Sequence, residues 1–147
     1  MSRMIKFRAW DKKNKWMCHV GELYLPRDDF ENGAVIDVYP LKDEDIKDLD
    51  DPWYEIIQPN FVLIQNTGLK DKNGKEIYEG DIVQTKNKFD KVVQEREITF
   101  GELVDYNEGY KIKVGIGFNI HNKDKGCFEY TEEVIGNIYE NPNLLIQ

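Results

Sequence analysis

The sequence predicts a mainly β protein, and two stretches carry most of that prediction. Over Tyr110–Ile120, six apolar side chains alternate with lysine, glycine or asparagine, a period of two that suits a strand and not a helix. In Asn66–Val83, two apolar segments flank Asp71-Lys-Asn-Gly74, which is the turn chemistry of a β-hairpin. Gly74 is expected to take the positive φ with which the chain enters the next strand.

The composition is that of a chain that folds. Of its 147 residues, 33% are charged, 40% are hydrophobic and 12% are aromatic, and this aromatic content is too high for a disordered protein. One domain is expected at this length. The only cysteines, Cys18 and Cys127, do not make a disulfide framework, so a reducing cytoplasm is the expected compartment.

A further hairpin is predicted at the start of the chain. Ile5, Phe7 and Ala9 alternate with other residues, and a polar turn separates them from Trp16–Val20. The turn, Asp11-Lys-Lys-Asn14, is spelled much like Asp71–Gly74. Asn14 is therefore expected to take the part of Gly74.

The middle of the chain is less regular. Val35–Tyr39 and the apolar run Phe61–Ile64 are predicted as strands. Ile46, Leu49 and Trp53 recur at helical spacing within a charged segment, and they predict one short amphipathic helix between the prolines at 40 and 52.

The last third is predicted to be β structure throughout. Gly115 and Gly117 fall on one face of the long strand and would let it coil sharply, as at the corner of a small barrel. The remaining expected elements are a polar loop at Lys86–Lys91, a strand around Ile98–Val104, a last strand at Val134–Tyr139 and a packed tail at Leu144–Ile146.

The charge of the chain disfavours some classes of partner. The formal net charge of −8 repels nucleic acid and anionic lipid on average. No run of about 18 apolar residues occurs, so neither secretion nor membrane insertion is expected. The acidic segment Asp43–Asp51 is interpreted as a solvated helix face, and its functional alternative is a docking site for a basic partner.

No motif predicts catalysis, a cofactor or a metal. Gly68–Lys75 resembles a phosphate loop only in part, because Glu76 stands where a magnesium-binding hydroxyl is needed. Gly115-Ile-Gly117 lacks the rest of a dinucleotide fingerprint. The metal-type side chains lack the close spacing of a zinc site, so an enzyme is not expected; they are Cys18, His19, His121 and Cys127.

One nucleic-acid hypothesis remains, disfavoured by the net charge. The first hairpin interleaves basic and aromatic residues, as a surface that binds single strands would. The alternative is a hairpin with one packed and one wet face. The residues concerned are Lys6, Arg8, Trp10, Lys12 and Trp16.

Three blocks of the sequence, in this order, resemble the YopX family of phage and prophage proteins. They are Lys6–Asp11, Thr67–Val83 and Val134–Pro142. The resemblance implies a phage or prophage origin, expression in a bacterial host and a fold built around a small SH3-type β-barrel. It supplies no catalytic residues.

Together these observations predict a single domain over residues 1–147, mainly β, with one short helix. Residues 1–60 are expected to form the N-terminal hairpin and the acidic connecting segment, and residues 61–147 the barrel core. The leading functional hypothesis is a non-enzymatic, cytoplasmic binding module that acts on a host or phage protein. The alternative is a nucleic-acid-binding barrel that uses the basic aromatic hairpin, and a homo-oligomer is left open.

Overall fold

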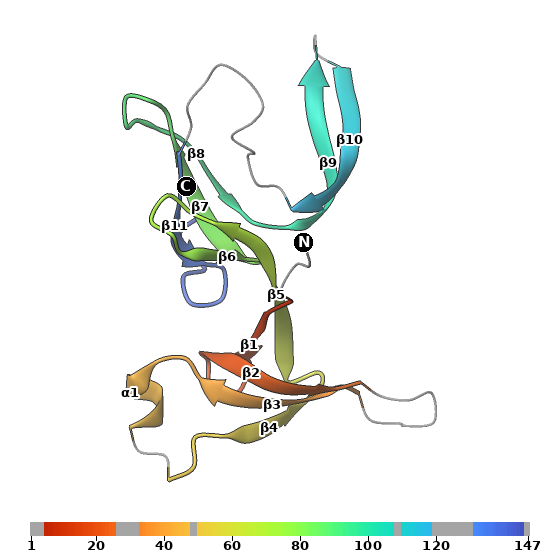
Figure 1. Cartoon of the computed structure of the whole chain (residues 1–147), viewed down its shortest axis with the longest axis vertical. Coiled ribbons are helices and arrows are strands. Elements are labelled where there is room, and N and C mark those ends of the chain that lie inside the picture. The colour runs from red at the N-terminus through yellow and green to blue at the C-terminus, as the bar shows by residue number, and fades with distance from the viewer. Residues whose placement is uncertain (1–4, 26–32, 48–49, 108–109, 119–130, 146–147) are drawn as a thin grey trace. The chain divides into compact units, whose positions relative to one another are not determined.

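Antiparallel strands dominate the computed structural model, which describes residues 5–25, 33–47, 50–107, 110–118 and 131–145 (Figure 1). These residues form eleven strands and one short helix, which confirms the predicted mainly β class. No helix in this part of the chain is long and apolar enough to cross a membrane. The elements are β1 (Phe7–Asp11), β2 (Trp16–Tyr24), β3 (Val35–Pro40), α1 (Asp43–Ile46), β4 (Tyr54–Ile57), β5 (Phe61–Lys70), β6 (Glu76–Tyr78), β7 (Asp81–Lys86), β8 (Val92–Glu97), β9 (Phe100–Asn107), β10 (Tyr110–Phe118) and β11 (Thr131–Asn137).

The chain divides into two compact units, residues 1–65 and 66–147. Strand β5 crosses the division: its first residues pair with β1, and its later residues pair with β6. The ladder order is therefore β4-β3-β2-β1-β5-β6, and a second sheet has the order β11-β7-β8. The sequence placed the division at residues 60 and 61, and the single domain stays a prediction.

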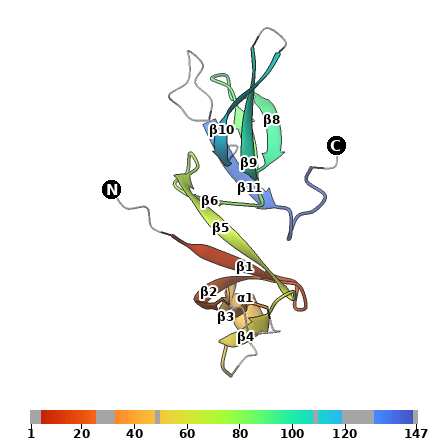
Figure 2. The same ribbon diagram turned by 90° about the vertical axis from the view of Figure 1, so that its right-hand side faces the viewer.

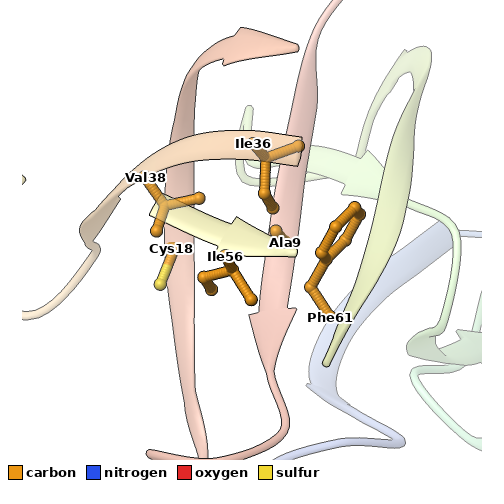
Figure 3. Close-up of a cluster of buried hydrophobic side chains, with 6 residues drawn as sticks. All are labelled: Ala9, Cys18, Ile36, Val38, Ile56 and Phe61. Carbon is orange, nitrogen blue, oxygen red and sulfur yellow. The ribbon is translucent and has the colours of Figure 1, made fainter. Parts of the chain in front are cut away.

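The N-terminal unit has its core on one side of the ladder β4-β3-β2-β1-β5. The sheet curls, because its two end strands contribute Ile56 and Phe61 to the same cluster (Figure 3). Alternation along β3 shows why one side of the sheet forms the core: Ile36 and Val38 are fully buried, while Asp37 between them is half-exposed. The cluster consists of Ala9, Cys18, Ile36, Val38, Ile56 and Phe61.

The C-terminal unit packs a smaller cluster of Ile77, Val83 and Ile98, with Val134 against it. Strands β9 and β10 form a long hairpin (Figure 2). Among the described residues the ladders do not close into a barrel. The tail prediction holds for Leu144, which is half-buried, whereas Leu145 is exposed.

The predicted helix exists but is shorter than its spacing suggested. It covers Asp43–Ile46 and buries no residue. Trp53 lies beyond it and is 47% exposed, and Leu49 falls outside the described residues. The spacing of Ile46 and Trp53 was therefore not that of one helical face.

The strand assignments made from the sequence differ from the structure in four places. β4 and β8 were not expected, because charged residues interrupt both. The predicted strand through Ile98 is broken there, since β8 ends at Glu97 and β9 begins at Phe100. In β10 the register shifts between Lys113 and Gly115, so the ladder with β9 is not uniform. The side chains of β10 are not among those described. The predicted core role of that strand therefore stays a prediction.

The two similar turns differ by one residue. In the hairpin of β5 and β6, Asp71 N donates to Lys75 O at 2.8 Å, and Gly74 has φ +81°, which confirms its predicted role. Between β1 and β2, Lys15 N donates to Asp11 O at 2.9 Å. The β1–β2 loop covers residues 12–15, one residue more than the β5–β6 loop, which covers 72–74. The positive φ, 60°, therefore falls on Lys15. The expectation for Asn14 was wrong.

Gly74→Val should destabilise the protein by about 1–2 kcal/mol, because the left-handed backbone disfavours a side chain. Nothing lies within 4 Å of a Cβ built at Gly74, so the cost would come from the backbone alone. Gly101→Val in β9 is the matched control: its Cβ also meets open space, and its φ lies outside the left-handed region. Denaturant melts should show a change within about 0.5 kcal/mol for the control. Equal losses would contradict the argument.

Candidate functional site

The candidate site is the side of β2, β3 and β4 that points away from the core, which we call the open face. The three strands lie side by side in the N-terminal unit (Figure 1). Because side chains alternate along each strand, the residues between the buried ones share this face. They are His19, Gly21, Glu22 and Tyr24 from β2, Val35, Asp37 and Tyr39 from β3, and Glu55 and Ile57 from β4, with Trp53 directly before it.

Cross-strand pairing arranges three carboxylates in one row. Glu22 is the partner of Asp37, and Asp37 is the partner of Glu55. A register shift in β2 between Val20 and Glu22 produces this alignment. Glu22 and Glu55 are exposed, and Asp37 is half-exposed. We call this set the acidic row.

Aromatic side chains lie on one flank of the acidic row. The ring centroids of His19 and Tyr39 are 6.4 Å apart, and those of Tyr39 and Trp53 are 5.3 Å apart. Gly21 allows this, because a Cβ there would lie 2.6 Å from Trp53 Cζ3. Trp53 therefore rests directly on the backbone of β2.

Apolar side chains lie on the other flank. Val35 is the partner of both Tyr24 and Ile57 in the ladders. Tyr24 is 51% exposed and Ile57 is 48% exposed, while the Tyr24 hydroxyl donates to a Glu22 carboxylate oxygen. The open face thus consists of an aromatic flank, an acidic row and an apolar flank.

The acidic row is electrostatically unfavourable as it stands. Like charges directly opposite each other on neighbouring strands destabilise a sheet. Among the described residues, no cationic side chain forms an ion pair with Asp37 or Glu55. The face therefore offers carboxylates that an external cation would stabilise.

On the opposite side of the sheet, a polar network holds β4 in place. Tyr54 donates from its hydroxyl to Asp11 Oδ2 at 2.8 Å and accepts from Trp16 Nε1 at 2.5 Å. The same hydroxyl lies 3.3 Å from the Cys18 sulfur. Burial and then the hydrogen bonds to Cys18 and Asp11 raise the pKa of the Tyr54 hydroxyl. The network is therefore neutral at Tyr54 and structural in character.

A hollow of about 430 Å³ adjoins this network. Its lining comes from the β1–β2 turn, from β4 and from the residues that follow β4. The lining residues are Asp11, Lys13, Asn14, Tyr54, Glu55, Ile56, Ile57 and Asn60.

Of the four metal-type residues, the structure describes only Cys18 and His19, which point to opposite sides of β2. Cys18 is buried in the core, whereas its neighbour His19 is exposed on the open face. His121 and Cys127 fall outside the described residues, and no group of potential metal ligands occurs among those described. The first three residues of the acidic segment, Asp43 to Asp45, lie in the first turn of α1.

The basic aromatic hairpin does not present its aromatic rings. Trp10 is only 9% exposed, and Trp16 is half-buried with its Nε1 bonded to Tyr54. A surface that binds single strands needs exposed rings on which bases stack. The packed-hairpin interpretation is therefore the better one for this element.

The open face was missed from the sequence. Glu22, Asp37 and Glu55 are far apart in the chain, and only the register of β2, β3 and β4 aligns them. The polar positions between buried ones in Val35–Tyr39 were visible, but β4 was not predicted. No sequence signal places Trp53 on this surface.

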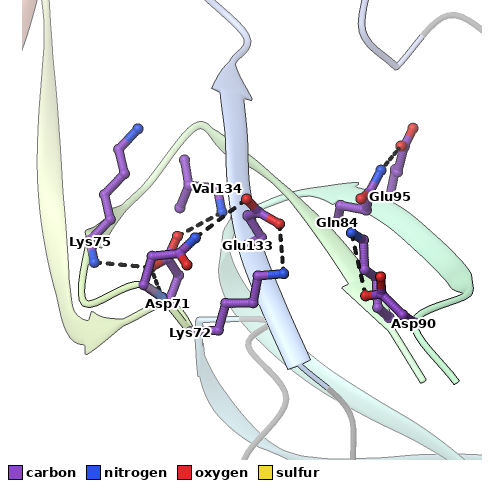
Figure 4. Close-up of polar contacts among 10 residues, drawn as sticks. Asp71, Lys72, Lys75, Gln84, Asp90, Glu95, Glu133 and Val134 are labelled. Carbon is purple, nitrogen blue, oxygen red and sulfur yellow. Dashed lines mark hydrogen bonds and ion pairs between the residues drawn. The ribbon is translucent and has the colours of Figure 1, made fainter. Parts of the chain in front are cut away.

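Hydrogen bonds and an ion pair hold the Asp71 turn against β11 in the C-terminal unit (Figure 4). Asp71 Oδ1 accepts from the backbone N of Asn73 and Lys75, and Asp71 Oδ2 accepts from Val134 N at 3.0 Å. Lys72 Nζ lies 2.9 Å from Glu133 Oε2. Burial would raise the pKa of Asp71, but its three backbone donors outweigh that effect and lower it.

Comparison with known proteins gives one family and several similar structures. The family model described as YopX protein matches residues 6–146. Protein EF1440 from Enterococcus faecalis is 29% identical, with a TM-score of 0.51, over 98% of this chain and 99% of that one. Protein yopX from Bacillus subtilis is 19% identical, with a TM-score of 0.48, over 98% and 99% of the two chains. No curated protein matches.

The Cys18 thiol should be unreactive in the folded protein, because burial raises its pKa to about 11. In a Cys127→Ser background, labelling with Ellman's reagent at about pH 8 should be at least about a hundredfold slower in buffer than in denaturant. Similar rates would show that Cys18 is accessible.

Asp71→Asn should destabilise the protein by about 1–3 kcal/mol at neutral pH, because it removes a charged acceptor from three backbone donors. The folded pKa of Asp71 is lowered, so its contribution is present above the unfolded pKa of about 3.9 and is lost as pH falls through the folded value. The difference from wild type should therefore shrink below about pH 4. Asp90→Asn is the control, since that side chain is 81% exposed. A difference that grows on acidification would contradict this account.

Proposed function

The chain belongs to the YopX family, and we propose that it is a non-enzymatic binding module that acts on a host or phage protein. The observation that carries the proposal is the open face. Tyr24, Trp53 and Ile57 are each about half exposed on one side of one sheet: 51%, 47% and 48%. Large apolar side chains gathered on one surface are typical of a protein-binding site.

The physical reason is the free energy available on covering this face. Burying apolar surface stabilises a complex by about 25 cal/mol per Å² removed from water. Trp and Tyr are also the residues most often found at the energetic centre of interfaces. Because Trp53 already rests on Gly21 and Tyr39, it is held in place before a partner arrives.

A protein partner fits this face better than nucleic acid does. The carboxylates of Glu22, Asp37 and Glu55 run across its centre and would repel phosphates. The formal net charge of −8 acts in the same direction. Trp10 and Trp16, on which the nucleic-acid hypothesis depended, are packed into the protein.

The polar groups nearest the hollow favour binding over catalysis. Asp11 is 2% exposed, and both of its carboxylate oxygens accept hydrogen bonds from the turn and from Tyr54. A carboxylate committed in this way is poorly suited to move protons. The proposal also includes a phage or prophage origin, the cytoplasm of a bacterial host and an SH3-type barrel within residues 61–147, and it applies to a single chain and to a homo-oligomer alike.

The test is capture of a partner by the tagged full chain from a lysate of the bacterium that carries it, with and without nuclease. A protein should be retained after nuclease treatment and lost at least about tenfold with Trp53→Ala/Ile57→Ser, because both side chains belong to the open face. Phe89→Ala/Val93→Ser is the control, since these side chains are 71% and 53% exposed in the C-terminal unit.

Capture that disappears with nuclease would instead favour the nucleic-acid hypothesis. Equal loss with both double variants, or no retained protein, would also contradict the proposed role of the open face. Thermal melts of both double variants establish that they are folded, which is expected because all four side chains are exposed.

A further inference from the structure

We propose that the partner is bound through an extended segment rich in arginine or lysine, which adds as a strand to the edge of β4 with its cations over the acidic row. This inference rests on the proposed function and specifies the chemistry of the partner. It follows from the free backbone groups of β4, the charge of the open face and the hollow beside it.

The first step concerns the backbone of β4, which is the last strand of its ladder. Gln58 N donates to Ala34 O at 2.9 Å. Hydrogen-bonded residues alternate along an antiparallel pair, so Tyr54 and Ile56 also direct their backbone groups toward β3. The backbone N–H and C=O groups of Glu55 and Ile57 consequently point away from β3, toward the unpaired edge of the sheet.

Few of these outward-pointing backbone groups of β4 already form a hydrogen bond. Ile57 O accepts from Asn60 N at 2.9 Å, which closes the turn after β4. The N and O of Glu55 and the N of Ile57 have no backbone partner among the described residues. A short extended segment can therefore pair with β4 around Glu55, in the manner of β-strand addition.

The second step concerns charge. In a strand added to β4, the residue opposite Glu55 would lie on the same face as the Glu55 side chain. That face carries Asp37 on the next strand and Glu22 beyond it. A cationic residue at this position would relieve the repulsion within the acidic row, so an acidic or neutral segment is disfavoured.

The flanks of the acidic row suit the rest of a long cationic side chain. The aliphatic stem of arginine or lysine can pack on Ile57, which is 48% exposed. The charged head of a neighbouring cationic side chain can lie over Trp53 or Tyr39, whose ring centroids are 5.3 Å apart. The open face thus provides an apolar flank on one side of the carboxylates and an aromatic flank on the other, and different cationic side chains of one segment can use them.

The third step concerns the residues between the cations. Their side chains would point to the other side of the added strand, where Tyr54 and Ile56 line the hollow of about 430 Å³. A small apolar side chain can pack on Ile56 there, while Lys13 in the same lining disfavours a further cation. The predicted partner segment therefore alternates cationic and apolar residues.

The edge of the other sheet does not share this chemistry. β8 ends the ladder of the C-terminal unit and exposes Val92 and Val93. The hairpin that precedes it carries Lys86, Lys88 and Lys91. With Asp90, Glu95 and Glu97 these cations leave no excess of carboxylates to attract a basic segment, so β8 serves as an internal control.

The experiment uses a fluorescent, capped octapeptide in which arginine alternates with valine, titrated with the full chain by anisotropy. Saturable binding that weakens with salt is expected, whereas the peptide with glutamate for arginine should not bind. N-methylation of the arginine nitrogens should abolish binding, because these N–H groups face β4. N-methylation of the valine nitrogens should leave it intact.

Asp37→Asn/Glu55→Gln should weaken peptide binding by about tenfold. Asp90→Asn/Glu95→Gln changes the net charge equally near β8 and should alter it by less than about twofold. The first double variant relieves like-charge repulsion, so it should fold at least as well as wild type.

Several outcomes would overturn the inference: no binding of the arginine–valine peptide, equal effects of the two double variants, or equal effects of the two methylation patterns. If a lysate protein is captured through Trp53 and Ile57 while the peptide fails to bind, the proposed function stands and this inference does not. If both experiments fail, both proposals are overturned.

Discussion

The buried carboxylate of Asp11 is the constraint on which the N-terminal unit depends. It accepts hydrogen bonds from the backbone N of Lys13 and Asn14 and from the Asn14 side chain, and these fix the β1–β2 turn. It also accepts from the Tyr54 hydroxyl, which belongs to β4 at the end of the ladder. A buried carboxylate without donors strongly destabilises a protein. The Asp11 carboxylate therefore ties the β1–β2 turn to β4. The open face is supported from behind by this connection.

A second aspartate has a comparable part in the C-terminal unit. Asp71 accepts from backbone N–H groups within its own turn and from Val134 of β11. At the end of β11, Asn137 Oδ1 accepts from Tyr139 N and Glu140 N. Asp11, Asp71 and Asn137 all lie in the blocks that resemble the YopX family. In this chain those blocks specify turns and the docking of turns onto strands.

Local features could be predicted from the sequence, and features that depend on register could not. The hairpins, β3 and the conformation of Gly74 follow from alternation and turn residues a few positions apart. The extra residue in the β1–β2 loop depends on which residues pair across the hairpin, so the assignment to Asn14 failed. β4 was missed because Glu55 interrupts its short apolar run. The acidic row required the pairing of three strands and a bulge in β2, which no local pattern contains.

The position of Trp53 gives the chain an optical property. Of the three tryptophans, Trp10 is 9% exposed, Trp16 is half-buried and bonded to Tyr54, and Trp53 is 47% exposed on the open face. Quenchers dissolved in the solvent will reach mainly Trp53, and a molecule that covers the open face will shield it. The red-shifted component of the intrinsic emission therefore reports on that surface, while the shielded component reports on the packing of the first hairpin.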